Sequence, residues 1–104
     1  MDELIREFEN KLRLEGKSDT TIKSYITSVN VFFRWFNDSF GEVGFKKLYR
    51  ENILEYKSYL KNVRTSKRTG QNLNAKTINV MLSGLIKYNE LMQPDNIVIS
   101  KADL

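Results

Sequence analysis

The 104-residue sequence contains no cysteine and no histidine. Without cysteine a disulfide framework is impossible, and without either residue a zinc finger or zinc ribbon lacks its ligands. The same two absences exclude Cys-His and Ser-His nucleophilic catalysis. Carboxylate or lysine chemistry stays open, but no grouping of such residues indicates an active site. We therefore expect no catalytic residue, no metal site and no cofactor in this chain.

Long apolar runs are also missing, and proline occurs once. Because no run approaches eighteen apolar residues, no membrane-spanning helix is predicted. Residues 1–4, MDEL, lack the basic and then apolar pattern of a signal peptide. The length suits one domain with one core. We expect a protein of the cytoplasm with no membrane partner.

Positive charge is concentrated in one part of the chain. The whole sequence has 17 Lys and Arg against 13 Asp and Glu, a net charge of +4. Residues 56–89 hold seven of the basic residues and no acidic residue, whereas the flanking segments are slightly acidic. Such a block is expected of a surface that binds a polyanion, although a solvated helix end and loop would look the same.

Four segments have apolar residues at the three- and four-residue spacing of a helix, and none alternates convincingly like a strand. Ser18 or Asp19 is a natural N-cap for the second segment, and Asn74 for the fourth. Pro94 is expected to end the fourth. The predicted helices cover about residues 2–14, 19–37, 50–63 and 74–92. The sequence thus predicts an all-α, four-helix domain over residues 1–93, followed by a linker or extended segment over 94–104.

Two of these helices carry a polar face without acidic residues, and a basic loop over 64–73 precedes one of them. A helix start offers free N–H groups and a partial positive charge, which suit a phosphate. Asn and Lys side chains further along a helix can read adenine and guanine in the major groove. From the helix starts, the polar faces and the loop, the candidate DNA-binding residues are Lys17, Ser18, Thr20, Thr21, Lys23, Thr27, Lys67, Arg68, Asn74, Lys76, Thr77, Asn79, Ser83 and Lys87.

Several candidates also have a purely structural explanation. Thr20 and Asn74 can serve as caps, Thr21 and Thr77 can pack through their methyl groups, and Lys87 can be a solvated surface charge. The coincidence of two such faces with a basic loop favours duplex DNA as the partner. The alternative is a helical protein-interaction module without nucleic-acid binding, which should expose an apolar patch instead.

Four segments in order resemble the core-binding domain of tyrosine recombinases, the phage integrase family. KSDTTIKSYITSVNVFFRWF (17–36) resembles the second helix of that domain, LYRENILEYKSYL (48–60) the third, and NAKTINVMLSGLIKY (74–88) the fourth. QPDNI (93–97) is similar to the connector into the catalytic domain. Tyr49 departs from the pattern, which favours a capping Ser or Thr there.

The resemblance implies a four-helix SAM-like bundle of the integrase core-binding type. It would form one half of a DNA clamp for integration or recombination, with its second and fourth helices toward the major groove. The family's catalytic domain carries Arg, Lys, a His-x-x-Arg motif and a nucleophilic Tyr. Because this chain has no histidine, that set is absent and none of its tyrosines is expected to be the nucleophile. Residues 94–104 are then the linker toward a catalytic domain outside this sequence, and further recombinase copies would join only through the full-length protein.

Overall fold

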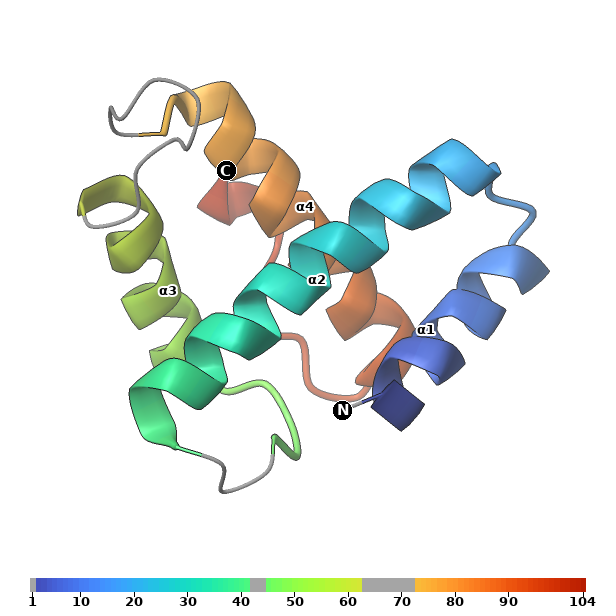
Figure 1. Cartoon of the computed structure of the whole chain (residues 1–104), viewed down its shortest axis with the longest axis horizontal. Coiled ribbons are helices and arrows are strands. Elements are labelled where there is room, and N and C mark those ends of the chain that lie inside the picture. The colour runs from blue at the N-terminus through green and yellow to red at the C-terminus, as the bar shows by residue number, and fades with distance from the viewer. Residues whose placement is uncertain (1, 42–44, 63–72) are drawn as a thin grey trace.

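The computed structural model describes residues 2–41, 45–62 and 73–104. Within these ranges the chain forms α-helices and a short 3-10 helix, and no strand. The elements are α1 (Asp2–Leu14), α2 (Asp19–Phe40), α3 (Arg50–Asn62), α4 (Ala75–Met92) and η1 (Lys101–Asp103). In Figure 1, α2 and α4 cross near their midpoints, with α1 and α3 on either side. The predicted all-α, four-helix class is confirmed.

Helices α2 and α4 begin where their caps predict. The Ser18 Oγ accepts a hydrogen bond from the N–H of Thr21 at 3.2 Å, and the Asn74 Oδ1 accepts one from the N–H of Thr77 at 2.8 Å. Each cap satisfies one of the N–H groups that a helix start leaves without an intrahelical partner. Both helix starts are therefore fixed by short-range sequence signals.

Helix α2 continues one turn beyond its predicted end near Asn37. It stops at Gly41, whose φ of 75° is left-handed backbone that glycine adopts without strain. The added turn carries Phe40, whose ring lies 4.9 Å from that of Phe36 between centroids. This aromatic contact and the glycine stop explain the extra length.

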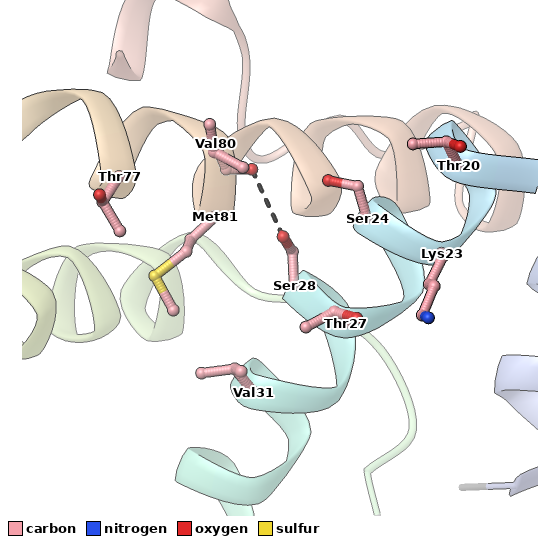
Figure 2. Close-up of a pocket in the computed structure, with 9 residues that line it drawn as sticks. All are labelled: Thr20, Lys23, Ser24, Thr27, Ser28, Val31, Thr77, Val80 and Met81. Carbon is pink, nitrogen blue, oxygen red and sulfur yellow. Dashed lines mark hydrogen bonds between the residues drawn. The ribbon is translucent and has the colours of Figure 1, made fainter. Parts of the chain in front are cut away.

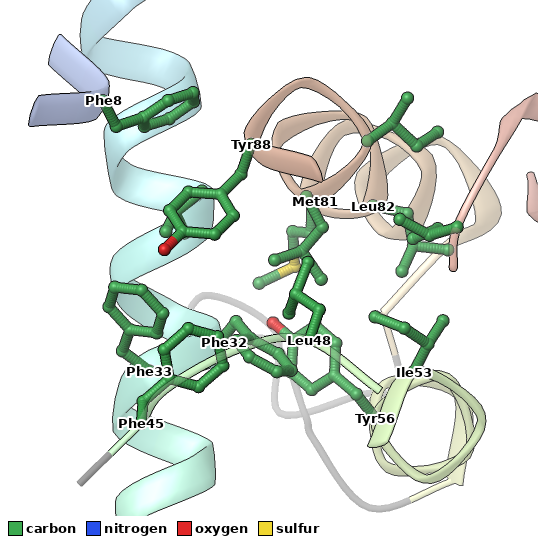
Figure 3. Close-up of a cluster of buried hydrophobic side chains, with 14 of the residues drawn as sticks. Phe8, Phe32, Phe33, Phe45, Leu48, Ile53, Tyr56, Met81, Leu82 and Tyr88 are labelled. Carbon is green, nitrogen blue, oxygen red and sulfur yellow. The ribbon is translucent and has the colours of Figure 1, made fainter. Parts of the chain in front are cut away.

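Aromatic rings from every helix meet in the core (Figure 3). The Phe32 ring of α2 makes an edge contact with Tyr56 of α3 at 5.0 Å between centroids. Tyr88 of α4 contacts Phe8 of α1 at 5.3 Å and Phe33 of α2 at 5.7 Å. All of these side chains are buried. Their edge-to-face contacts add to the free energy gained by removing large apolar surfaces from water.

The C-terminal segment folds back onto the bundle, although the sequence predicts an extended segment there. Ile99 is buried, and the fully buried Asn89 side chain accepts from the Val98 N–H at 2.8 Å. Its amide group also donates to the carbonyls of Gln93 and Asn96, each at 3.1 Å. Among the described residues the segment therefore has no partner strand: the Asn89 side chain of α4 forms hydrogen bonds with its backbone, and Ile99 packs into the core.

Ion pairs fasten the end of this segment to α3. The Nη1 and Nη2 atoms of Arg50 each lie 2.9 Å from a carboxylate oxygen of Asp103, in a bidentate arrangement. The Lys57 ammonium lies 3.3 Å from the same carboxylate. Residues 94–104 therefore belong to the packed unit in this structure, and their role as a link to a further domain stays a prediction.

Candidate nucleic-acid interface

An open groove of about 460 Å³ lies between α2 and α4. Figure 2 shows Thr77 and Met81 of α4 on one side and Thr27, Ser28 and Val31 of α2 on the other. Thr20, Lys23, Ser24 and Val80 complete its lining. The groove brings together four predicted DNA contacts from both helices, namely Thr20, Lys23, Thr27 and Thr77.

The lining is chemically suited to a polyanion. Five of its nine residues carry hydroxyl groups, one carries an ammonium group, three are apolar and none is acidic. Hydroxyls can donate to phosphate oxygens and can donate to or accept from base edges. A lysine supplies the charge that phosphate attracts. The groove therefore offers donors and positive charge with no carboxylate of its own to repel a phosphate.

The groove exists because the two helices touch closely at one point and diverge from it. At the crossing, the Ser28 Oγ donates to the carbonyl of Val80 at 3.4 Å. Gly84 lies against Ser28 with no room for a side chain. Toward their N-termini the helices separate (Figure 1), so that Thr20 and Thr77 border the same opening.

Two other candidate contacts serve as caps. The Ser18 Oγ accepts from the Thr21 N–H and also donates to the Thr21 Oγ1 at 3.0 Å. The Asn74 Oδ1 accepts a hydrogen bond from the Thr77 N–H. Thr21 is half-buried, whereas Lys17 and Lys76 are exposed beside the two caps. The caps therefore position the helix starts, and the lysines beside them remain accessible to a ligand.

The only acidic side chain in the first turn of α2 is bound by a neighbouring cation. Asp19 lies 3.0 Å from the guanidinium of Arg13. This guanidinium also contacts Glu9 at 3.1 Å, and the hydrogen bonds to Asp19 and Glu9 raise the pKa of Arg13. All three groups are well exposed. Arg13 thus partly offsets the negative charge of Asp19 near a predicted phosphate site.

The predicted polar face of α4 is divided between two environments. Lys76 is exposed and Asn79 is half-buried near the groove. Ser83 is half-buried and donates to the Asn79 carbonyl at 2.7 Å. Lys87 lies at the other end, 2.8 Å from Glu15, and its side chain is 18% exposed. The hydrogen bond to Glu15 is the main cause of its raised pKa, so Lys87 is already paired within the fold.

The sequence pattern did not reveal this pairing, nor five of the groove residues. Glu15 comes from the end of α1, and helical spacing on α4 cannot show which charges other elements bring to it. Ser24 and Ser28 follow Thr20 at four-residue intervals, which is a signal that could have identified one wall. Candidates Lys67 and Arg68 lie outside the described residues.

Residues 4–90 match the family described as phage integrase, N-terminal SAM-like domain. The chain belongs to this family. It is also 36% identical, over 107 aligned residues, to a protein of Bacillus thuringiensis named TnP I resolvase. That alignment covers 98% of this chain and 34% of the relative, so the chain spans about a third of the relative's length. No solved structure matches the chain.

The match confirms the family resemblance of the sequence and identifies the chain with the SAM-like N-terminal domain of integrases. Two tyrosines of this integrase domain belong to its buried core. Tyr56 is fully buried, and Tyr88 is 3% exposed. Burial raises the pKa of Tyr88 to about 12. Both rings therefore act in the described part of the fold as core side chains.

Other kinds of site find little support in residues 2–41, 45–62 and 73–104. These residues contain no cluster of three or more Asp or Glu side chains placed to hold a metal ion. None of the helices formed by them is long and apolar enough to cross a membrane. Large apolar side chains are exposed on several elements, including Leu14 on α1 and Leu54 on α3. The α2–α4 groove is the surface that best matches a ligand class.

Proposed function

We propose that this domain binds duplex DNA for a site-specific recombinase, with the α2–α4 groove against the major groove of the recombination site. The observation that carries the proposal is the groove itself, which gathers hydroxyl and ammonium groups of two helices without a carboxylate. Membership of the integrase family and similarity to a protein named a resolvase support a role in recombination.

Different parts of the groove have different roles in this proposal. Lys23 and Lys76 neutralise phosphates on the two sides of the major groove. Thr20 and Thr77 donate to phosphates near the helix starts, where backbone N–H groups add to the attraction. Thr27 lies further along α2 and meets base edges. Lys87 is left out of the contact set, because Glu15 already occupies its ammonium group.

Strand cleavage and joining are assigned to another part of the recombinase. The chain aligns with 34% of the TnP I resolvase, and it has no histidine for the family's His-x-x-Arg motif. By itself the domain should grip DNA without forming a covalent tyrosine–DNA adduct. On the recombination site, other copies of the recombinase would bind beside it through the full-length protein.

Salt-dependent binding of a fluorescein-labelled 24-bp duplex, followed by anisotropy, tests the proposal. With roughly four to six phosphate contacts, log K should fall against log salt with a slope of about −4 to −5. Lys23→Ala and Lys76→Ala should each reduce this slope by about 1. Lys46→Ala is the matched control, because Lys46 is equally exposed but lies outside the groove.

Circular dichroism should show the same helix content and melting temperature for all three variants, because surface lysines contribute little to stability. Binding that is tight and indifferent to salt would contradict the electrostatic basis of the proposal. A loss in Lys46→Ala alone, with Lys23→Ala and Lys76→Ala unchanged, would show that another face binds the duplex.

A further inference from the structure

One side chain of the groove is unsuited to phosphate. Val80 lies in the N-terminal third of α4 and is 48% exposed, although it lines a groove rich in hydroxyl groups. Valine has a lower helix propensity than Ala, Lys or Gln, and about half of the Val80 surface remains in contact with solvent. Val31 and Met81 line the same groove. The groove therefore has an apolar part that phosphate binding does not use.

The position of Val80 is set firmly by the helix crossing. Its own carbonyl accepts from the Ser28 Oγ at 3.4 Å. One turn further along, Gly84 allows α4 to approach the backbone and side chains of α2. Branching at Cβ restricts the valine χ1 angle in a helix. An apolar group thus lines the groove beside the crossing, and Figure 2 draws it above the side chains of Thr77 and Met81.

In the major groove of DNA, the matching apolar group is the 5-methyl of thymine. It is the only methyl group among the base edges of unmodified DNA, and aliphatic side chains contact it. We propose that Val80 recognises pyrimidine 5-methyl groups, so that the domain prefers thymine-containing sites. This inference rests on the proposed DNA-binding function. Val31 extends the apolar surface, and the hydroxyls around it bind neighbouring polar edges.

Removing only the methyl group from the DNA gives the sharpest test. Affinity is measured for a 24-bp alternating dA·dT duplex and for the same duplex with deoxyuridine in place of thymidine. Burying one methyl group is worth roughly a fourfold change in affinity, so the wild-type domain should bind the uracil duplex about three- to fivefold more weakly. A dG·dC duplex with 5-methylcytosine, compared with its unmethylated form, should gain a similar factor.

Val80→Ser should bind the thymine and uracil duplexes equally. Serine and valine have similar helix propensities, and the site is exposed, so the fold should be kept. Leu54→Ser is the matched control, because Leu54 is 51% exposed on α3 and lies outside the groove. This variant should keep the wild-type preference for the methylated duplexes.

The outcomes separate the inference from the function on which it rests. Equal wild-type binding of the thymine and uracil duplexes, with a salt slope of about −4 to −5, would overturn the role of Val80 and leave DNA binding intact. Absence of binding to every duplex at low salt would refute the proposed function and the inference with it. Since the uracil comparison uses the unmutated domain, it holds even if Val80→Ser misfolds.

Discussion

A Cβ atom added at Gly84 would lie 2.5 Å from the Cβ of Ser28 and 3.2 Å from the carbonyl oxygen of Tyr25. No real side chain sits so close to another residue, so α2 and α4 cross at a distance that only glycine permits. Ser28 is itself small and 5% exposed. This contact fixes how closely the two helices approach at the crossing, next to the groove that they line.

Gly84→Ala should destabilise the domain by about 1–2 kcal/mol. The overpacked crossing costs roughly 1–3 kcal/mol, and the better helix propensity of alanine recovers up to about 1 kcal/mol. The Ser28 Cβ is bonded directly to the backbone of α2, so it cannot move away as the end of a long side chain can. Urea denaturation monitored by circular dichroism measures the loss in unfolding free energy.

The partner residue provides the control for this prediction. Adding Ser28→Gly to Gly84→Ala removes the Cβ that the new methyl group meets, so part of the lost stability should return relative to Ser28→Gly alone. Adding Ser28→Ala keeps that Cβ and should not relieve the clash. If Gly84→Ala were as stable as the wild type, close helix contact would not be what holds the crossing.

Asn89→Ala should loosen the C-terminal segment while the helical core stays folded. The Val98 N–H would lose its acceptor, at a cost of about 1–3 kcal/mol for a buried group left unsatisfied. The carbonyls of Gln93 and Asn96 would lose the Asn89 amide but keep a second donor each. Amide hydrogen exchange at Val98 should therefore become at least tenfold faster. Asn96→Ala is the control. Asn96 accepts the hydrogen bond from Asn89 through its backbone carbonyl, which the substitution keeps.

Asp103 should make stability depend on acidic pH. Hydrogen bonds from Arg50, the Ser100 N–H and Lys57 hold the pKa of Asp103 well below its ordinary value. Because the folded pKa is the lower one, the contribution is complete above the ordinary range near pH 4. It is lost progressively as the pH falls from there through the folded pKa.

Urea denaturation between pH 2 and pH 7 tests this dependence. Asp103→Asn should lose about 1–3 kcal/mol at pH 7, the usual range for hydrogen bonds to charged groups, and should show a weaker decline toward acid. Asp95→Asn changes an exposed carboxylate and should keep the wild-type profile. Parallel wild-type and Asp103→Asn curves would mean that the Arg50–Asp103 pair contributes nothing to the pH dependence.

Lys87→Ala should affect folding and not DNA. The Lys87–Glu15 pair joins α4 to the end of α1 at 2.8 Å, and partly exposed pairs of this kind contribute up to about 1 kcal/mol. We expect a small loss in melting temperature and an unchanged slope of DNA affinity against salt. A slope reduced by about 1, as expected for Lys23→Ala, would return Lys87 to the contact set.

Most of the fold could be predicted because its signals are short-range. Caps at Ser18 and Asn74 lie within three residues of the N–H groups that they satisfy. Apolar residues at helical spacing predicted the four helices, and in α2 such residues as Phe32 and Phe33 are buried. The family resemblance then supplied the arrangement of the helices, which periodicity alone does not contain.

The rest depends on contacts between residues distant in sequence. The hydrogen bond between the Val98 N–H and the Asn89 side chain forms only because the segment after Pro94 turns back toward α4. No local sequence pattern predicts that turn. Glu15 meets Lys87 across 72 positions of chain. Predicting the groove would need two pieces of information. The polar faces of the helices can be identified from the sequence. The close contact at Gly84 cannot, because a glycine within a helix indicates only a low helix propensity.

The most direct test of the account is an NMR titration of the ¹⁵N-labelled domain with a 24-bp duplex at low and moderate salt. If the α2–α4 groove binds DNA, amide shifts should concentrate at Thr20, Lys23, Thr27, Thr77 and Val80, and should shrink as salt rises. Shifts confined to the exposed face of α3 around Leu54, with the groove signals unmoved, would contradict the central claim.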